Sequence, residues 1–195
     1  MQCASEALDY KGRSVVVLPG DVPMMTPRMI RGLIDQHDGA ITIGSMIPDE
    51  PFGYGRIVRG DDGSVLRIVE QKDASEAEQS IPEVNTAIYV FDGDFLFGSS
   101  EGERGAVFEL DTDNKQKEYL LTDVVGIATQ RGLRVGAAVI PDPAEVAGVN
   151  DRAQLADLER ETRVRIARDW LRAGVSMDDP ATCLLYTSPS PRDRG

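Results

Sequence analysis

The sequence predicts an α/β fold, and three observations support this prediction. Val15–Leu18 is a short continuous apolar run, typical of a strand buried on both faces in a parallel sheet. A helical pattern then runs from Thr26 to about Gly39, and Ala40–Ile47 has the composition of a second strand. The order strand, helix, strand fits one βαβ unit. Strands and helices keep alternating further along the chain, which is the arrangement of α/β domains.

The helix after the first strand carries its own boundary signals. Thr26 suits the N-cap, and Pro27 suits the first helical position because an N–H there would have no helical partner. Gly39 stands where such a helix would stop. The only histidine, His37, falls at the polar edge of the apolar face of this helix. We expect no catalytic role for it.

The middle of the chain predicts a hairpin. Gly53–Arg59 and Ser64–Gln71 have strand composition, and Gly60–Gly63 is the turn between them. Asn85–Asp92 is a further strand rich in β-forming residues. The later predicted elements are a helix over Glu118–Arg131 that ends at Gly132, a strand over Leu133–Ile140, and a long helix from about Asp151 to Ala173.

Charge and composition limit the partners of this chain. Its 195 residues carry a formal net charge of −12, which argues against nucleic acid or an anionic membrane because phosphate groups select clustered Lys and Arg. No apolar run is long enough to span a bilayer. Cys3 and Cys183 match no metal-ligand or redox spacing, so we interpret them as free thiols. An acidic protein can still bind a phosphorylated small molecule if a metal ion or local donors offset the repulsion.

Asp21 is the first candidate site residue. It follows the first strand in a segment that Pro19 and Pro23 stiffen, and ligands of open α/β sheets bind beyond the carboxyl ends of strands. Gly20 lets a ligand approach the backbone, and a lone carboxylate suits Mg²⁺, which completes its octahedron with water and substrate phosphate. Asp also favours the turn before a helix, so spacing alone leaves these two interpretations about even.

Polar residues at other strand ends form a second group of candidates. Gly55 offers a bare backbone, while Glu70 and Asn85 stand at the ends of two predicted strands. Such groups could bind sugar hydroxyls, although surface exposure explains each of them equally well.

Asn150 precedes the long helix, and its simplest interpretation is an N-cap. Asp151 and Gln154 offer a competing capping pair. The chain contains neither G-x-x-x-x-G-K-[ST] nor G-x-G-x-x-G, so it has no recognised motif for a triphosphate.

Six blocks of sequence occur in a recognisable order. They are LPGDVPMMTP, DEPFGYGRIVR, IVEQKDAS, EVNTAIYVFD, KEYLLTDVV and VAGVNDRAQLADLE. Together they resemble the uridylyltransferase domain of N-acetylglucosamine-1-phosphate uridylyltransferase / glucosamine-1-phosphate acetyltransferase, the bifunctional family that makes UDP-N-acetylglucosamine. The resemblance runs from Met1 to about Thr182. It implies a Rossmann-like nucleotidyltransferase domain with a mixed, mostly parallel sheet, followed by a long linker helix.

The resemblance also implies a reaction and a site. The reaction transfers UMP from UTP to N-acetylglucosamine-1-phosphate and gives UDP-N-acetylglucosamine and pyrophosphate, while the parent enzyme also acetylates glucosamine-1-phosphate. Asp21 and Asn150 are implied to hold Mg²⁺. Ala87 stands where a glycine is common in the family. The residues implied to lie at the substrate are Pro19, Gly20, Asp21, Gly55, Glu70, Asn85 and Asn150.

The chain is expected to have four parts, the first three by this resemblance. Residues 1–150 would be a partial nucleotidyltransferase domain, 151–174 the linker helix, and 175–182 the start of a left-handed β-helix. Residues 183–195 lack any periodicity, so we interpret them as a non-native tail. The family's glycine-rich triphosphate loop is expected upstream of Met1, so we expect negligible turnover from this chain alone. A cytoplasmic parent enzyme that forms a homotrimer is implied. The alternatives are a non-catalytic sugar-nucleotide-binding module and a nucleotidyltransferase for another sugar-1-phosphate.

Overall fold

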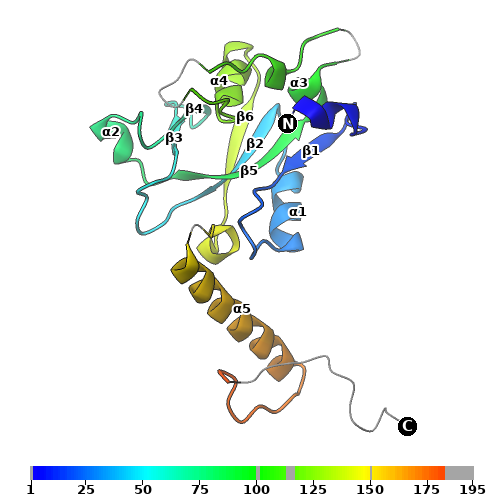
Figure 1. Ribbon diagram of the computed structural model, residues 1–195. Helices are drawn as coiled ribbons and strands as arrows, with labels where there is room; N and C mark the ends of the chain where they lie inside the picture. The colour runs from blue at the N-terminus through cyan, green and yellow to red at the C-terminus, as the bar shows by residue number, and fades with distance from the viewer. Residues whose placement is uncertain (1, 100–101, 113–116, 150, 183–195) are drawn as a thin grey trace. The chain divides into compact units, whose positions relative to one another are not determined.

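The computed structural model describes residues 2–99, 102–112, 117–149 and 151–182, and the chain divides into two compact units. Within these residues, the first unit, Met1–Ala147, holds a six-stranded sheet with helices on both faces (Figure 1). The strands are β1 (Ser14–Val17), β2 (Ile41–Met46), β3 (Arg56–Arg59), β4 (Val65–Val69), β5 (Val84–Asp92) and β6 (Val135–Val139). The helices are α1 (Pro27–Asp35), α2 (Glu76–Gln79), α3 (Gly93–Phe97) and α4 (Asp123–Gln130), with short 3-10 helices at Gln2–Glu6, Ala106–Phe108 and Pro143–Val146.

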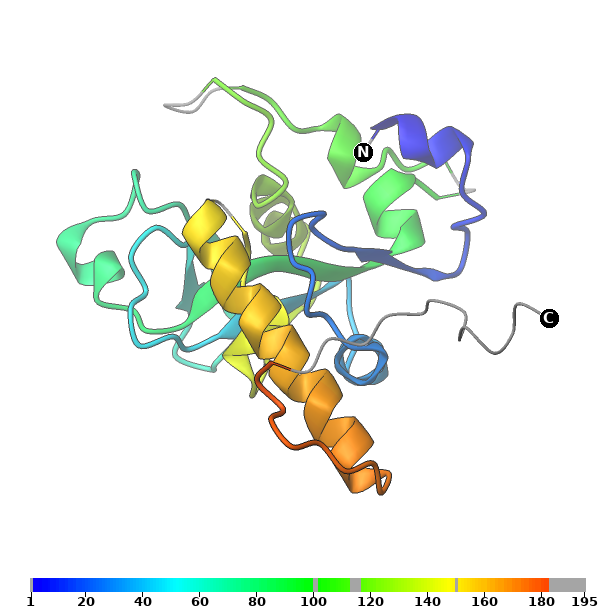
Figure 2. The same ribbon diagram turned by 60° about the horizontal axis from the view of Figure 1, so that its bottom comes forward.

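The sheet is mixed and mostly antiparallel. Its order is β4–β3–β5–β2–β6, and β1 also pairs with β5, the long strand that crosses the middle of this unit in Figures 1 and 2. Among the described strands, β2 and β6 form the one parallel pair, so the prediction of a mostly parallel sheet is wrong. An apolar run carries no information about the direction of a neighbouring strand. The direction of β5 is set by its long-range pairing with strands on both of its edges.

The first strand differs from its prediction in burial as well. β1 pairs with β5 through Ser14 opposite Asp92 and Val17 opposite Tyr89, and its residues are exposed or half-buried. It is therefore not the strand buried on both faces that its apolar run predicts. The βαβ unit is confirmed in another form: β1 and β2 both oppose β5, so they run in the same direction, and α1 connects them across it.

Two apolar layers position the sheet. On one face α1 buries Met29 and Leu33 against side chains of β5 and β6. On the other face α3 and α4 cover the sheet. The buried side chains of this second layer include Ile41, Ile43, Ile57, Tyr89, Phe91, Phe95, Leu96, Val124, Val125 and Ala128. Burial of apolar area on this scale is the main favourable contribution to folding.

Several predicted boundaries are confirmed. The Thr26 hydroxyl accepts a hydrogen bond from the Met29 N–H at 3.2 Å, and Pro27 is the first residue of α1. The hairpin turn closes through the Gly60 N–H and the Ser64 carbonyl at 2.9 Å. His37 lies 3.0 Å from the Thr42 hydroxyl through Nδ1, and burial lowers the pKa of its ring against the opposing charges of nearby aspartates.

A bulge interrupts the pairing of β2 with β5. Gly44 lies opposite Ile88 and Ser45 opposite Asn85, so Thr86 and Ala87 are the extra residues on β5. Ala87 has a φ of 60°, in the left-handed region. A Cβ there costs about 1–2 kcal/mol, which a glycine would avoid.

Ala87→Gly is therefore expected to stabilise the first unit by about 1 kcal/mol. Urea denaturation followed by circular dichroism measures the change. Ala137→Gly is the control, because Ala137 lies in β6 without a positive φ and its replacement should lower stability. Equal destabilisation by both substitutions would show that the backbone at residue 87 is not strained.

The second unit, Gly148–Gly195, is described by itself. It contains α5 (Arg152–Arg172), in agreement with the predicted long helix. Asp151 is its N-cap and accepts a hydrogen bond from the Gln154 N–H at 2.8 Å, so the competing capping pair is the one observed. Asn150 and residues 183–195 lie outside the described residues. Among the helices that the structure describes, none is both long and apolar enough to cross a membrane.

Candidate functional site

Three of the predicted site residues lie in one row across the sheet. β3 and β4 pair Arg56 with Val69, so the residues next in register, Gly55 and Glu70, stand opposite each other. On the other side of Gly55, the Asn85 N–H donates to the Gly55 carbonyl at 2.9 Å. Residues in direct register point to the same face of a sheet. The side chains of Glu70 and Asn85 therefore flank a position that has no side chain.

Gly55 stands where a larger residue would be crowded. A Cβ built there would lie 3.0 Å from the Ile68 Cγ2 and 3.5 and 3.6 Å from the two carboxylate oxygens of Glu70. The glycine itself is buried. Its lack of a side chain thus leaves a strip of backbone beside a carboxylate, which is suited to a ligand with several hydroxyl groups.

Thr122 adds a hydroxyl group that the sequence analysis missed. It is 8% exposed, directly precedes α4, and donates to Glu70 Oε1 at 3.3 Å. The sequence predicts a helix that begins at Glu118 and would include Thr122, whereas α4 begins only at Asp123. Thr122 makes no side-chain capping bond, so its hydroxyl belongs to the Glu70 cluster instead.

The amide of Asn85 is held in one orientation. Its Oδ1 accepts from the Ala87 N–H at 3.1 Å, and its Nδ2 donates to the Tyr89 hydroxyl at 2.8 Å. The Ala87 N–H can only donate, so it identifies the oxygen of the amide. One N–H and one lone pair of Asn85 remain for a ligand.

Arg56 and Gln71 hold the other two members of the row in place. Arg56 is 2% exposed and donates through Nη2 to Gln71 Oε1 at 2.8 Å and through Nη1 to the Tyr54 carbonyl. Gln71 Oε1 also accepts from the Gly53 N–H at 3.1 Å. Tyr54 and Arg56 flank Gly55, and Gln71 follows Glu70. These bonds therefore hold the segment around Gly55 against the segment around Glu70.

Negative charge gathers at the start of α4. Burial raises the pKa of Asp123, and the charges of Asp111 and Asp73 raise it further. Asp123 directly follows Thr122, which contacts Glu70. A phosphorylated ligand would be repelled by this group of carboxylates unless a cation or donors offset their charge.

Asp21 lies in the loop between β1 and α1. It is exposed, while Val22 and Met24 beside it are each 6% exposed and anchor the loop. β1 ends at Val17, which lies opposite Tyr89. Because β1 runs antiparallel to β5, it leaves the sheet at the end of β5 that contains Asn85. The loop that carries Asp21 therefore lies at the same end of the sheet as the row. A Cβ on Gly20 would meet nothing within 4 Å, so space is open beside this carboxylate.

The metal ligands remain a prediction. Asn150 lies outside the described residues, so its position relative to Asp21 is not tested. Within the described part of the chain, no three His, Cys, Asp or Glu side chains form a metal-binding group. A Mg²⁺ site needs only one or two protein oxygens and would not form such a group. An exposed carboxylate with open space beside it fits that requirement.

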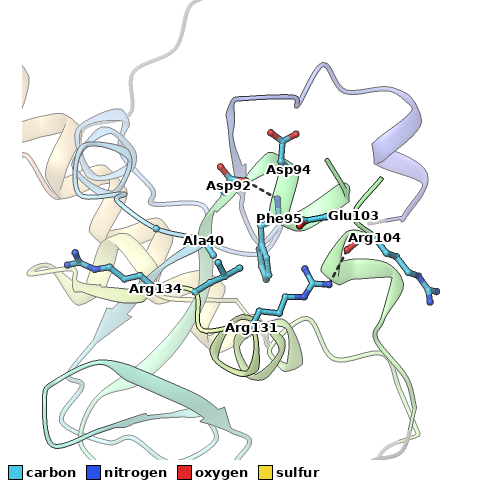
Figure 3. Close-up of a pocket in the computed structure, with 10 residues that line it drawn as sticks. Ala40, Asp92, Asp94, Phe95, Glu103, Arg104, Arg131 and Arg134 are labelled. Carbon is cyan, nitrogen blue, oxygen red and sulfur yellow. Dashed lines mark hydrogen bonds between the residues drawn. The ribbon is translucent and has the colours of Figure 1, made fainter. Parts of the chain in front are cut away.

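A cavity lies at the end of the sheet opposite the row. It has a volume of about 780 Å³, and Ala40, Phe95 and Leu133 contribute its apolar wall. Arg131 lies over the Phe95 ring at 5.7 Å and donates to Glu109 at 2.7 Å and to the Arg104 carbonyl (Figure 3). The three arginines that line it, Arg104, Arg131 and Arg134, already have acceptors, and the cavity contains none of the predicted site residues. We therefore place the candidate site at the row and not at this cavity.

The fold resembles that of a solved structure. A solved structure described as a "Putative Glucose-1-Phosphate Thymidylyltransferase" from Bacillus anthracis aligns with a TM-score of 0.53, over 92% of this chain and 62% of that chain. The sequence identity is 13%, so this likeness concerns the fold alone. It supports a Rossmann-like nucleotidyltransferase fold.

The family follows from sequence. A family model described as nucleotidyl transferase matches residues 1–130. The chain belongs to the nucleotidyl transferase family. It is 48% identical over 186 residues to the bifunctional protein GlmU of Geobacter metallireducens and 44% identical over 185 residues to that of Corynebacterium aurimucosum. Each match covers 93% of this chain, and the chain spans about 37% of the length of these curated relatives.

Proposed function

We propose that this chain forms the sugar-nucleotide part of an enzyme that transfers UMP from UTP to N-acetylglucosamine-1-phosphate, with UDP-N-acetylglucosamine and pyrophosphate as products. The observation that carries this proposal is the row of Glu70, Gly55 and Asn85 across three strands. A carboxylate acceptor, an amide with free capacity and a bare backbone between them match the alternating hydroxyl and amide groups of an N-acetylated sugar.

We further propose that Asp21 and Asn150 hold Mg²⁺ beside the phosphates, with the backbone of Pro19 and Gly20 next to them. The exposed carboxylate of Asp21 and the open space at Gly20 support this role. Bound there, the cation would neutralise phosphate charge that the protein's own acidic groups repel. The chain's residues position the sugar and orient its phosphate for in-line attack.

The first test is binding of UDP-N-acetylglucosamine to the 195-residue chain by calorimetry in the presence of Mg²⁺. We expect saturable binding that is at least tenfold tighter than binding of UDP-glucose or dTDP-glucose. Tighter binding of UDP-glucose or dTDP-glucose would favour a nucleotidyltransferase for another sugar. Absence of binding in the presence of Mg²⁺ would contradict the assignment of the sugar site.

Asp21→Asn should weaken this binding about tenfold in Mg²⁺ and leave it unchanged in EDTA, because the substitution removes a metal ligand and not a sugar contact. Asp49→Asn is the matched control, since Asp49 is an exposed loop carboxylate outside the predicted site. Binding that ignores both Mg²⁺ and residue 21 would favour a non-catalytic sugar-nucleotide-binding module.

Turnover is a separate question from binding. No segment of this sequence carries a recognised triphosphate motif, and we expect the chain alone to release no measurable pyrophosphate from UTP and N-acetylglucosamine-1-phosphate. Full-rate release would contradict that expectation. For the full-length parent we propose a cytoplasmic homotrimer that also acetylates glucosamine-1-phosphate.

A further inference from the structure

The hydroxyl of Tyr89 is a buried polar group next to the candidate site. Tyr89 is 2% exposed, and its ring stacks on Phe91 with the centroids 5.4 Å apart. Its hydroxyl oxygen accepts from Asn85 Nδ2 at 2.8 Å. A phenylalanine would fill the same apolar volume, so the hydroxyl serves something other than packing.

The bond from Asn85 to Tyr89 is one of the two hydrogen bonds that hold the Asn85 amide in place. The terminal amide torsion of asparagine has a broad, nearly twofold energy profile, and one hydrogen bond leaves it loosely defined. Ala87 N–H holds Oδ1 and Tyr89 holds Nδ2, so both ends of the amide are tied from within β5 and its bulge. The Ala87 N–H sets which amide atom of Asn85 is the oxygen, and the Tyr89 hydroxyl restricts rotation of the amide about its torsion.

The electrostatic surroundings keep the tyrosine protonated. Burial raises the pKa of its phenol well above the ordinary value, and the negative charge of Glu70 raises it further against the effect of the Asn85 bond. The phenol is therefore neutral at any pH at which the protein is used. Its oxygen is a permanent acceptor for the amide.

We propose that Tyr89 is a positioning residue for sugar recognition, which fixes the amide of Asn85 so that its free N–H and lone pair face the N-acetylated sugar. This inference rests on the proposed function. Tyr89 does not contact the sugar in this proposal and acts through its hydrogen bond with Asn85. The sugar contact of Asn85, and not the nucleotide, is what its hydroxyl controls.

Tyr89→Phe tests this with one atom removed. We expect affinity for UDP-N-acetylglucosamine to fall about fivefold, the effect of one lost neutral hydrogen bond, while affinity for UDP stays within twofold of the unchanged protein. Tyr10→Phe is the matched control, because Tyr10 packs against Phe97 of α3, at the other end of the sheet. It should change neither affinity. An equal loss for both ligands in Tyr89→Phe would indicate general damage to the fold and overturn the proposal.

A double-substitution cycle shows whether the hydroxyl acts through Asn85. In an Asn85→Ala background, Tyr89→Phe should have no further effect on sugar-nucleotide affinity. A full additional loss would mean that the hydroxyl acts by another route, and the proposal would fall.

A second measurement needs no ligand. Hydrogen exchange of the Asn85 side-chain amide, followed by NMR, should be faster in Tyr89→Phe than in the unchanged protein, and unchanged exchange would overturn the positioning role. If the unchanged protein binds no UDP-N-acetylglucosamine, the proposed function fails, whereas the exchange experiment still decides whether Tyr89 orients Asn85.

Discussion

Gly55→Ala is expected to weaken binding of UDP-N-acetylglucosamine about 30-fold, or ~2 kcal/mol, without unfolding the chain. The new methyl group would lie 3.0 Å from Ile68 Cγ2, which must shift slightly, and within 3.6 Å of the Glu70 carboxylate. A sugar would then be lifted off the backbone, and its hydrogen bonds to both side chains would lengthen together. Calorimetry with the sugar nucleotide measures the loss directly.

Gly136→Ala is the matched control for this substitution. Gly136 lies in β6 of the same sheet, and a Cβ there would meet nothing within 4 Å. The control should bind with unchanged affinity, and its stability should rise slightly because alanine loses less chain entropy than glycine. If Gly55→Ala bound the sugar nucleotide as tightly as Gly136→Ala, the row would not be the sugar site.

The sequence predicts the local elements of this protein better than it predicts their pairing. The cap at Thr26, the turn at Gly60 and the long helix after Asp151 all follow from short-range signals, and the structure confirms them. Strand direction depends on contacts between distant segments, so no local pattern in Val15–Leu18 distinguishes a parallel neighbour from an antiparallel one. The sheet is mostly antiparallel because β5 lies between strands that run the other way.

The candidate site shows the same division. Gly55, Glu70 and Asn85 could be named from the sequence as polar or bare positions at strand ends, but their meeting in one row depends on the register of two strand pairs. A register shift of one residue would move each side chain to the other face. Thr122 was missed since its contact with Glu70 joins segments far apart in the chain.

An ion pair between the exposed Arg59 and the nearly buried Glu83 supports the sheet near this row. Glu83 is 9% exposed and accepts hydrogen bonds of 2.7 Å from Arg59 Nε, Arg59 Nη2 and the Ser45 hydroxyl. These contacts join β3, β2 and the start of β5. Burial alone would raise the pKa of Glu83, but the bonds from Arg59 and Ser45, with the charge of Arg59, hold it below its ordinary value.

Glu83→Gln is expected to lower the free energy of unfolding by about 1–2 kcal/mol at pH 7, because it removes the counter-charge of the solvent-accessible Arg59 guanidinium and weakens its hydrogen bonds. The folded-state pKa of Glu83 is depressed, so its contribution is complete above the unfolded value near 4.5 and is lost as pH falls through the folded value. The difference between the two proteins should therefore be constant from pH 7 to about 5.5 and shrink in more acidic solution. Urea denaturation at a series of pH values measures it.

Glu76→Gln separates this effect from a general loss of negative charge. Glu76 is exposed on α2 and has no part in the Glu83 network, so its replacement should change stability by less than ~0.5 kcal/mol at every pH. A Glu83→Gln difference that stayed constant down to pH 3 would show that shape, and not charge, sets the contribution of this residue. In that case the short contacts between Glu83 and Arg59 would be packing contacts. The charge of the pair would then not hold β2, β3 and β5 together.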